Sequence, residues 1–496
     1  MKGFIKNLLK ALNVPEGEDE TPSPPPASAK AAGIRPEPVP ETPSAEEPAS
    51  PEQPAPAPAP VRGLKPAKPS DQTLPTAPAP LPTKGGNTPD SPVLTLFFEV
   101  HQPNRLKPYN FFDIGNDPFY EDDDLNRKIL DKVSERCYLP ANALFTRLLE
   151  EHAGQFRMAM SLSGVFIEQL EHHRPDVLES FKKLHATGHL ELLSETYYHS
   201  MGYHRSKDDF TEQVALHKAK LKEHFGVKPS LFRHTEQVYF NEFAAHIERL
   251  KFKGMMAEGV AQHLNGRSPN HLYRSPNVKS MPVILRNGQL SDDIGFRFAD
   301  TSWDQWPLTA ETYAAWCAAS GGDVLNIALD YETIGEHQGA ETGIFDFWEE
   351  FPRLWLESGH RFATPSEVVD ELKPVGIYDC HEPTSWADAE KDLSPWKGNA
   401  MQLEARKKIL LIEQAVKDHD DAELLHQWRK MQTSDHFYYM STKGGAAGQV
   451  HDYFRPYASA YDAYLYYMNA LSDLQLRVES GEEPVREEIA PDPNYG

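Results

Sequence analysis

Short apolar runs recur along the middle of the chain, and most are separated by polar stretches with helical character. Seven of them read as strands: residues 93–100, 156–163, 190–193, 230–232, 254–257, 294–298 and 324–329. The intervening stretches include residues 175–186 and 210–224, whose composition is typical of helices. Strands that alternate with helices indicate βαβ units and a parallel sheet, and seven strands are about the number needed to close a barrel.

The pattern changes after Pro365. Residues 400–431 are rich in Ala, Leu, Glu, Lys and Gln and contain no Pro or Gly, so this long segment is predicted to be helical. Residues 457–474 are similar, with aromatic side chains at the apolar positions. We therefore predict an α/β barrel over residues 91–370, a helical region packed beside it over residues 371–478, and a flexible tail over residues 479–496.

The N-terminal segment has a different composition. Residues 15–90 carry about half of the 42 prolines and almost no aromatic residues, which predicts a disordered linker rich in Pro and Ala. Residues 1–14 place apolar side chains at helical spacing and lysines on the opposite face, but the lysines interrupt the apolar stretch that a signal peptide needs. A short fraying helix and a helix that docks on a membrane surface or an assembly both fit this pattern.

Charge and cysteine content restrict the class of protein. The formal net charge of −24 argues against nucleic acid or an anionic membrane as the main partner, because both favour a basic surface. Cys137, Cys317 and Cys380 lie far apart and form no CxxC pair, so we expect neither a disulfide framework nor a zinc–thiolate site. These features predict a reduced, cytoplasmic setting, and outside residues 1–14 no apolar run approaches the length that spans a bilayer.

Two carboxyl groups follow strand-like runs directly. Glu236 lies in SLFRHTEQVYFNE, just after the apolar start of that stretch, and Asp330 ends the run in DVLNIALDYETIGEHQG. Glu332 follows two residues later and shares the side of Asp330 if the strand stays extended. Polar residues at strand ends are typical of the active-site face of a (β/α) barrel, and a pair of carboxyl groups suits glycoside hydrolysis. The structural alternative for Glu236 is an ion pair with Arg233.

Two further polar clusters follow predicted strands. His101 begins the stretch HQPN, where it either orients a sugar hydroxyl, binds a metal or has only a structural role. GHLELLSETYYHS contains Glu191 and Glu195, followed by aromatic residues that suit stacking on a pyranose or simple core packing. No HxxH, HExxH or HxH pair adjoins the carboxyl groups, so we expect no metal.

Five stretches in order, HQPN, GHLELLSETYYHS, FRHTEQVYF, ALDYETIGEH and SDHFYYMSTKG, resemble the motifs of the α-amylase-like branch of glycoside hydrolase family 57. The resemblance extends over residues 92–474, which include SWADAEKDLSPWKGN. It implies a retaining enzyme on α-glucans without a cofactor, with an incomplete (β/α)7 barrel and C-terminal helices that complete the active site. By position, Glu236 matches the nucleophile, Asp330 the general acid/base, and His101, Glu191 and Asp435 residues that bind the substrate.

Several alternatives stay open. His234 stands where members of this branch carry Asn, and an imidazole there either shifts the pH response of Glu236 or replaces one hydrogen bond by another. Hydrolysis, 4-α-glucanotransfer and branching of a maltooligosaccharide chain share the same first step and differ in the acceptor. A non-catalytic α-glucan binding module and a metal-dependent deacetylase are hypotheses from other classes, and the sequence leaves the oligomeric state undetermined.

Overall fold

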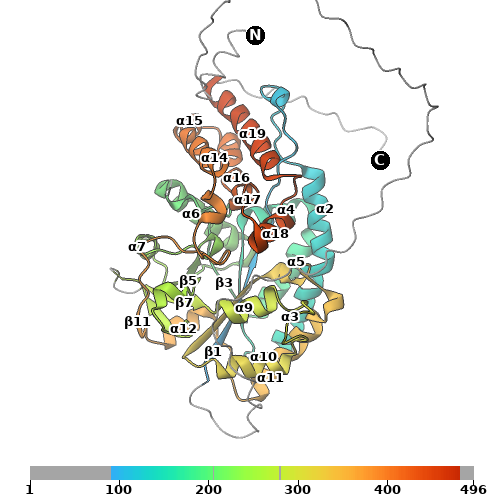
Figure 1. Cartoon of the computed structure of the whole chain (residues 1–496), viewed down its shortest axis with the longest axis vertical. Coiled ribbons are helices and arrows are strands. Elements are labelled where there is room, and N and C mark those ends of the chain that lie inside the picture. The colour runs from blue at the N-terminus through green and yellow to red at the C-terminus, as the bar shows by residue number, and fades with distance from the viewer. Residues whose placement is uncertain (1–90, 205, 277, 279–280, 481–496) are drawn as a thin grey trace, which may run out of the picture. The chain divides into compact units, whose positions relative to one another are not determined.

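The computed structural model describes residues 91–480 except residues 205, 277, 279 and 280 (Figure 1). The predicted N-terminal helix, the Pro-rich linker and all but the first two residues of the predicted tail lie outside the described residues.

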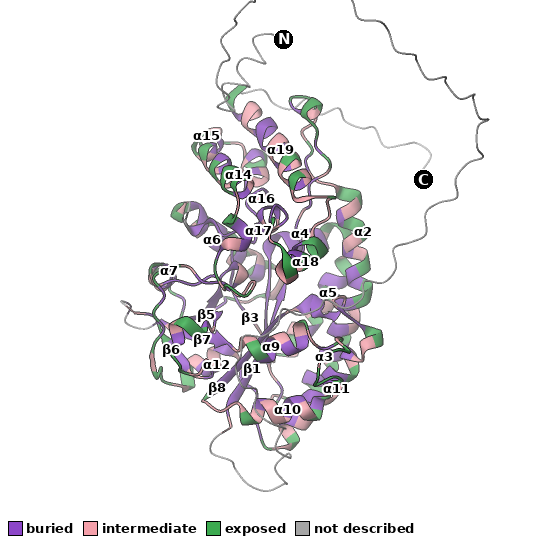
Figure 2. Ribbon diagram, in the orientation of Figure 1, coloured by how far each residue is buried: buried purple, intermediate pink, exposed green. Residues whose placement is uncertain are grey.

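Parallel strands form the centre of the fold, and in Figure 2 they are coloured as buried. β1 pairs with β2 and β8, β2 with β3, β4 with β5, and β5 with β7, all in parallel. The strands are β1 (Val93–Val100), β2 (Met158–Leu162), β3 (Leu190–Leu192), β4 (Leu231–Arg233), β5 (Gly254–Glu258), β7 (Pro282–Arg286) and β8 (Val324–Asp330).

Two short contacts join these pairs into an incomplete barrel. Arg286 of β7 pairs with Asn326 of β8, and a bridge between Ser194 and Phe232 links the end of β3 to β4. β6 (Leu272–Arg274) adds to β7 in the antiparallel direction, and β11 (Gly376–Ile377) adds to β6. A sheet of parallel strands in an incomplete (β/α)7 barrel is the predicted fold class, which the structure confirms.

One predicted strand is wrong. Ile294 lies in helix α9 (Gly288–Gly295), which is capped by Asn287, whose side chain accepts a hydrogen bond from the backbone N–H of Leu290. The apolar run from residue 294 resembles a strand in composition, but on the helix Ile294 lies one turn beyond Leu290 and both are buried. The real strand is β7, which begins with Pro282, a residue tolerated at the first position of a strand.

Helices surround the barrel on its outer side (Figure 1). The predicted helix over residues 175–186 is α5, and the prediction for residues 210–224 falls inside α6. The helices are α2 (Asp123–Val133), α3 (Leu139–Glu151), α4 (Gly164–His173), α5 (Pro175–Ala186), α6 (Lys207–Phe225), α7 (Asn241–Arg249), α8 (Ala261–Leu264), α9, α10 (Ala310–Ala319), α11 (Ile344–Glu357) and α12 (Pro365–Glu371).

The C-terminal part of the described chain is helical, as predicted, and the predicted helical segment over residues 400–431 is divided into α14 (Ala400–Leu411), α15 (Glu413–Asp418) and α16 (Ala422–Lys430). Asp420 has a φ of +53° and the Asp421 side chain accepts hydrogen bonds from Glu423 and Leu424, so a new helix starts there. The other helices are α13 (Ser394–Lys397), α17 (Ser434–Tyr438), α18 (Gly445–Phe454) and α19 (Ala460–Ser480).

Side chains inside the barrel form layers because every second residue of a strand faces inward. The middle layer is apolar, and its residues belong to one buried cluster that includes Phe97, Ala159, Leu193, Met256, Ile284 and Ala328. Two positions further along β1 and β8 stand Glu99 and Asp330, which are direct neighbours in the register. The change from apolar to ionisable side chains therefore falls at the carboxyl ends of the strands.

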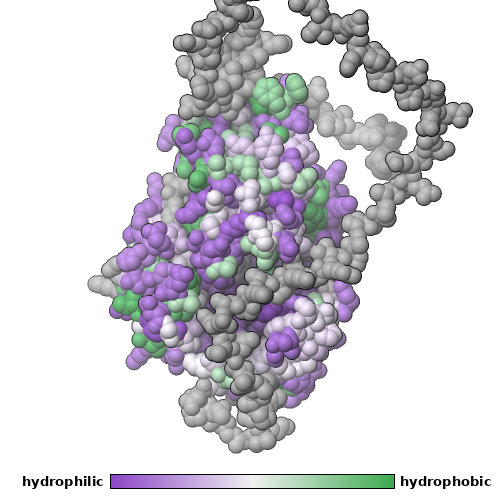
Figure 3. All heavy atoms as spheres, in the orientation of Figure 1, coloured by the Kyte–Doolittle hydropathy of each residue, from purple (hydrophilic) through white to green (hydrophobic). Residues whose placement is uncertain are grey.

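The face shown in Figure 3 is mostly hydrophilic, with small scattered apolar patches. Among the described residues no helix is both long and apolar enough to cross a bilayer.

Gly335, just beyond the end of β8, provides a test of this fold. Its φ is +100° and a Cβ there would clash with the carbonyl oxygen of Arg136. Gly335→Ala is therefore expected to lower the free energy of unfolding by about 3 kcal/mol or more. Gly188→Ala, at φ +75° with no atom within 4 Å of the added carbon, should lower it by about 1 kcal/mol. Equal losses in denaturant titrations of the two variants would contradict the tight packing at Gly335.

Candidate active site

Glu236 lies in a sharp turn directly after β4. Glu236 and Gln237 have φ values of +59° and +53°, a left-handed conformation that side chains other than glycine adopt at an energetic cost. Trp386 Nε1 donates to Glu236 Oε2 at 2.9 Å, and Ser434 Oγ donates to Oε1 at 3.0 Å. Both carboxylate oxygens are therefore held by donors that come from beyond residue 380.

Asp330 is the last residue of β8, and its side chain belongs to the polar layer at the strand ends. Burial and the negative charge of Glu236 raise the pKa of Asp330 to about 6, although Arg233, Arg286 and His199 oppose this shift. An aspartic acid with this pKa both donates and accepts a proton near neutral pH, as a general acid/base must.

Arg233 is fully buried and pairs across the barrel. Its guanidinium forms a close ion pair with Glu99 of β1, and its Nη1 lies 3.6 Å from Glu195 Oε2. Burial lowers the pKa of Arg233 to about 9, although the charges of Glu236 and Asp330 oppose this. In the described chain Arg233 forms its ion pairs with Glu99 and Glu195. The structure therefore does not show the Arg233–Glu236 ion pair that the sequence offered as the structural alternative.

His199 joins this network from the turn after β3. Its Nδ1 lies 3.0 Å from Glu195 Oε2 and its Nε2 lies 3.2 Å from Glu99 Oε1 and 3.8 Å from Glu236 Oε1. Burial alone would lower the pKa of His199, but the hydrogen bond to Glu195 and the surrounding carboxylates raise it to about 9. His199 is therefore a cation at neutral pH.

His101 and Asp435, both predicted to bind substrate, meet beside His199. His101 Nε2 lies 3.2 Å from Asp435 Oδ2, its Nδ1 lies 2.6 Å from Ser163 Oγ, and its ring stacks on His199 at 3.8 Å. Burial and the charge of His199 lower the pKa of His101 to about 4. Burial opposes ionisation of Asp435, but His101 and His199 hold the pKa of this carboxyl well below its usual range.

Glu191 is the one predicted site residue that the structure does not bring to this cluster. Its carboxylate accepts a hydrogen bond from the Ser366 backbone at 2.9 Å and another from the Ser366 hydroxyl, at the start of α12. Glu191 lies in β3 and Glu195 lies just beyond its end. Both side chains take inward positions, with Leu193 between them. Four residues of extended chain cover about 13 Å, so Glu191 lies two layers below Glu195.

The structure also locates two residues whose roles the sequence left open. The His234 ring packs among Phe210, Phe232 and Phe243, the nearest centroid being at 4.4 Å, on the opposite side of the strand from Arg233. β8 ends at Asp330, so Glu332 lies in a 3-10 turn where it accepts a hydrogen bond from the Tyr138 hydroxyl at 2.5 Å.

The Glu332 carboxyl is buried. Burial and the charge of Asp330 raise the pKa of Glu332 to about 8.

Several residues of this cluster were not predicted as site residues: Glu99, Glu195, His199, Arg233, Trp386 and Ser434. Of these, Glu195 and His199 fall within GHLELLSETYYHS, Arg233 within FRHTEQVYF, Trp386 within SWADAEKDLSPWKGN and Ser434 within SDHFYYMSTKG, all stretches that carry the family resemblance. Glu99 lies inside an apolar run. A single glutamate at an inward position of a buried strand was the signal that could have indicated it as a site residue.

Two trios in this cluster have the composition of a metal site, and they share His199. The potential ligand atoms of His101, His199 and Asp435 lie within 4.8 Å of one another, and so do those of Glu99, Glu195 and His199. A metal ligand must be a neutral imidazole, however, whereas the pKa of His199 is raised to about 9 and both its nitrogens face carboxylates. In this arrangement each nitrogen of the protonated His199 ring faces a carboxylate, Nδ1 facing Glu195 and Nε2 facing Glu99.

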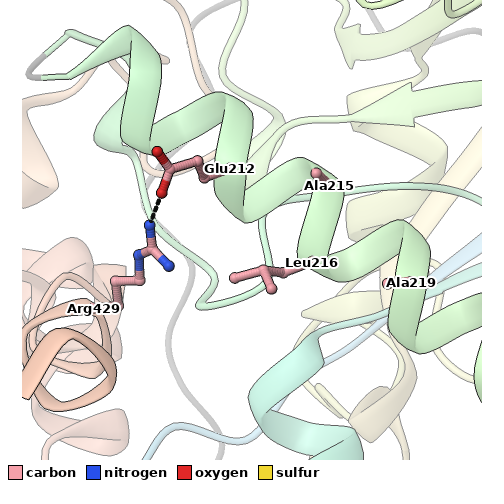
Figure 4. Close-up of a pocket in the computed structure, with 5 residues that line it drawn as sticks. All are labelled: Glu212, Ala215, Leu216, Ala219 and Arg429. Carbon is pink, nitrogen blue, oxygen red and sulfur yellow. Dashed lines mark hydrogen bonds and ion pairs between the residues drawn. The ribbon is translucent and has the colours of Figure 1, made fainter. Parts of the chain in front are cut away.

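Two surface cavities lie away from the strand ends. One, of about 320 Å³, is lined by one face of α6 and by Arg429 of α16, with an ion pair between Glu212 and Arg429 at its edge (Figure 4). The other, of about 780 Å³, is lined by residues that include Phe252, Pro282 and Val369 near the start of β5 and β7. Neither cavity is lined by Glu236 or Asp330. The candidate active site is therefore identified by its ionisable side chains and not by the size of a cavity.

A barrel with two carboxyl groups at its strand ends is an arrangement that glycoside hydrolases use. Residues 95–381 match the model of glycosyl hydrolase family 57. The "Putative alpha-amylase" of Methanocaldococcus jannaschii is 41% identical over 402 residues, which are 78% of this chain and 85% of that protein. The chain belongs to glycosyl hydrolase family 57.

Solved structures share the fold. A branching enzyme of this family from Pyrococcus horikoshii has a TM-score of 0.56 at 15% identity, covering 73% of this chain and 87% of its own. The 4-alpha-glucanotransferase of Thermococcus litoralis has a TM-score of 0.51 at 16% identity, covering 70% of this chain and 56% of its own. At these identities the likeness concerns the fold alone.

The electrostatic coupling of the two carboxyl groups is directly testable. Because the negative charge of Glu236 raises the pKa of Asp330, Glu236→Gln should lower this pKa from about 6 toward the usual aspartate value of about 3.9. Titration of labelled aspartate carboxyl carbons by NMR would measure it. Glu191→Gln, which removes a charge two layers below, should leave the Asp330 titration unchanged, and an equal shift in both variants would contradict the coupling.

Proposed function

We propose that this protein is a retaining enzyme that cleaves α-1,4-glucosidic bonds through a covalent intermediate on Glu236. The observation that carries this proposal is the different environment of the two carboxyl groups. Glu236 accepts hydrogen bonds at both oxygens, whereas burial and the charge of Glu236 raise the pKa of Asp330 to about 6. Two neighbouring carboxyl groups in unlike environments can divide the roles of nucleophile and acid.

In the first step Asp330 donates its proton to the glycosidic oxygen while Glu236 attacks the anomeric carbon. The bond to the leaving sugar breaks and an ester forms between Glu236 and the retained sugar. In the second step the ionised Asp330 removes a proton from the acceptor, which displaces Glu236 and restores both carboxyl groups.

His101 and Asp435 are proposed to bind the sugar in the cleaved subsite. Their side chains lie 3.2 Å apart, next to His199, which itself lies 3.8 Å from Glu236. An ionised aspartate accepts hydrogen bonds from sugar hydroxyls, and a neutral histidine offers both a donor and an acceptor. This part of the proposal needs no cofactor.

The acceptor in the second step distinguishes three activities. The M. jannaschii relative carries the name of an α-amylase, which favours water as acceptor, while the structural neighbours are a 4-alpha-glucanotransferase and a branching enzyme. Transfer to a sugar hydroxyl is therefore the second candidate function. The intact Glu236 and Asp330 weigh against a non-catalytic glucan-binding module.

The roles of the carboxyl groups predict large losses of activity on substitution. Glu236→Gln and Asp330→Asn should each lower kcat/KM on maltoheptaose by about a thousandfold or more while leaving the thermal transition nearly unchanged. Glu191→Gln is the matched control, and because Glu191 bonds Ser366 below the site we expect its kcat/KM to stay near that of the wild type. A Glu236 or Asp330 variant that kept more than about a tenth of the activity would refute its assigned role.

The choice of acceptor predicts the products. Incubation of the wild-type enzyme with maltoheptaose alone should release only shorter sugars if water attacks the intermediate. A ladder that includes longer chains would instead establish glucanotransfer, and new α-1,6 linkages seen by NMR would establish branching. Absence of any turnover of maltooligosaccharides would refute the proposed substrate class.

A further inference from the structure

Trp386 holds Glu236 at two points. Its indole Nε1 donates to Glu236 Oε2 at 2.9 Å, and its backbone N–H donates to the Glu236 carbonyl oxygen at 3.3 Å. The second bond restrains the same residue whose backbone adopts a left-handed conformation at φ +59°. One residue thus fixes both the orientation of the carboxylate and the turn that carries it.

The indole itself is fixed by two buried cations. The guanidinium carbons of Arg233 and Arg286 lie 5.4 Å and 5.6 Å from the Trp386 ring centre, within the range of cation–π attraction. Arg233 is in turn bound to Glu99, and Arg286 Nη1 lies 3.2 Å from Glu258 Oε2. Two arginines at the ends of β4 and β7 therefore fix the position of the Trp386 indole, although Trp386 follows the barrel in the sequence.

The segment around Trp386 is also held to the barrel. Tyr239 and Thr384 exchange backbone hydrogen bonds of 3.1 Å and 2.9 Å, and Lys391 Nζ donates to the Trp386 carbonyl oxygen at 2.7 Å. Lys391 further approaches Glu258 Oε1 at 3.7 Å. Restraints at Thr384 and at Trp386 itself leave the indole little freedom to turn away from Glu236.

We propose that Trp386 is the positioning residue of the nucleophile: its indole N–H aims the Glu236 carboxylate, and its backbone N–H stabilises the strained turn. This inference rests on the proposed role of Glu236. It places part of the catalytic machinery in the segment between the barrel and the C-terminal helices. A charge-assisted hydrogen bond of this kind fixes the direction of attack on the anomeric carbon.

The test is Trp386→Phe, which keeps a ring between the two guanidinium groups and keeps the backbone bond but removes the indole donor. We expect kcat to fall about 10- to 100-fold while KM changes less than about threefold. The loss should be equal on maltoheptaose and on α-maltosyl fluoride, because fluoride leaves without a proton and still requires the nucleophile. Asp330→Asn, by contrast, should lose activity on maltoheptaose but retain the first-turnover release of fluoride, because that step needs no proton donor and only the second step then lacks its base.

Trp428→Phe is the matched control. Trp428 is buried in α16 and its Nε1 donates to the Ile409 carbonyl oxygen at 2.8 Å, so this variant also loses one indole hydrogen bond. Its melting temperature should fall, but kcat on both substrates should equal that of the wild type. If Trp386→Phe fails to fold, Trp386→Leu removes the same donor and replaces it in the assay.

Three outcomes would overturn the inference: a Trp386 variant with wild-type kcat, a loss confined to KM, or a loss confined to maltoheptaose. The last would mean that Trp386 acts through Asp330. A wild-type enzyme that turns over neither substrate would instead refute the proposed function, so the two failures are distinguishable.

Discussion

The buried ion pair between Arg233 and Glu99 is the interaction on which the rest of the site depends. It connects β4 with β1 across the barrel, and both side chains are removed from water. An uncompensated buried charge costs several kcal/mol, so the fold is stable only when these strands bring the two partners together. Glu195 and His199 complete the neutralisation from the end of β3, and the resulting field helps determine the protonation of the carboxyl groups around it.

The same network explains how two carboxyl groups at one barrel end acquire different properties. Asp330 titrates near pH 6 because it is buried beside a second negative charge, whereas Glu236 finds hydrogen-bond donors at both oxygens. Those donors come from residues 386 and 434, beyond the last barrel helix. The barrel therefore supplies the carboxyl groups, and the C-terminal part of the chain supplies the groups that orient one of them.

Much of the fold was predictable because it depends on local periodicity. β1, β5 and β8 were recognised within one residue of their ends, since a buried parallel strand is a continuous apolar run. The wrongly predicted strand also has a local cause, because the run from Ile294 contains strand-forming residues but follows the helix cap Asn287. Residues 400–431 are helical as predicted, but composition does not show that Asp420, with its left-handed backbone, divides them.

The sequence by itself determined which strands end in ionisable residues, and so indicated Glu236, Asp330 and His101, whereas Asp435 in α17 was indicated only by the resemblance of SDHFYYMSTKG to a family motif. Only the tertiary structure decided which side chains meet. Glu191 in β3 and Glu195 just beyond it share one face. Nothing in the local sequence shows that Glu195 reaches the active-site layer while Glu191 lies two layers below it. Trp386 lies 150 residues from Glu236 along the chain, and a contact over that separation is set by packing and charge pairing, which leave no periodic signal in the sequence.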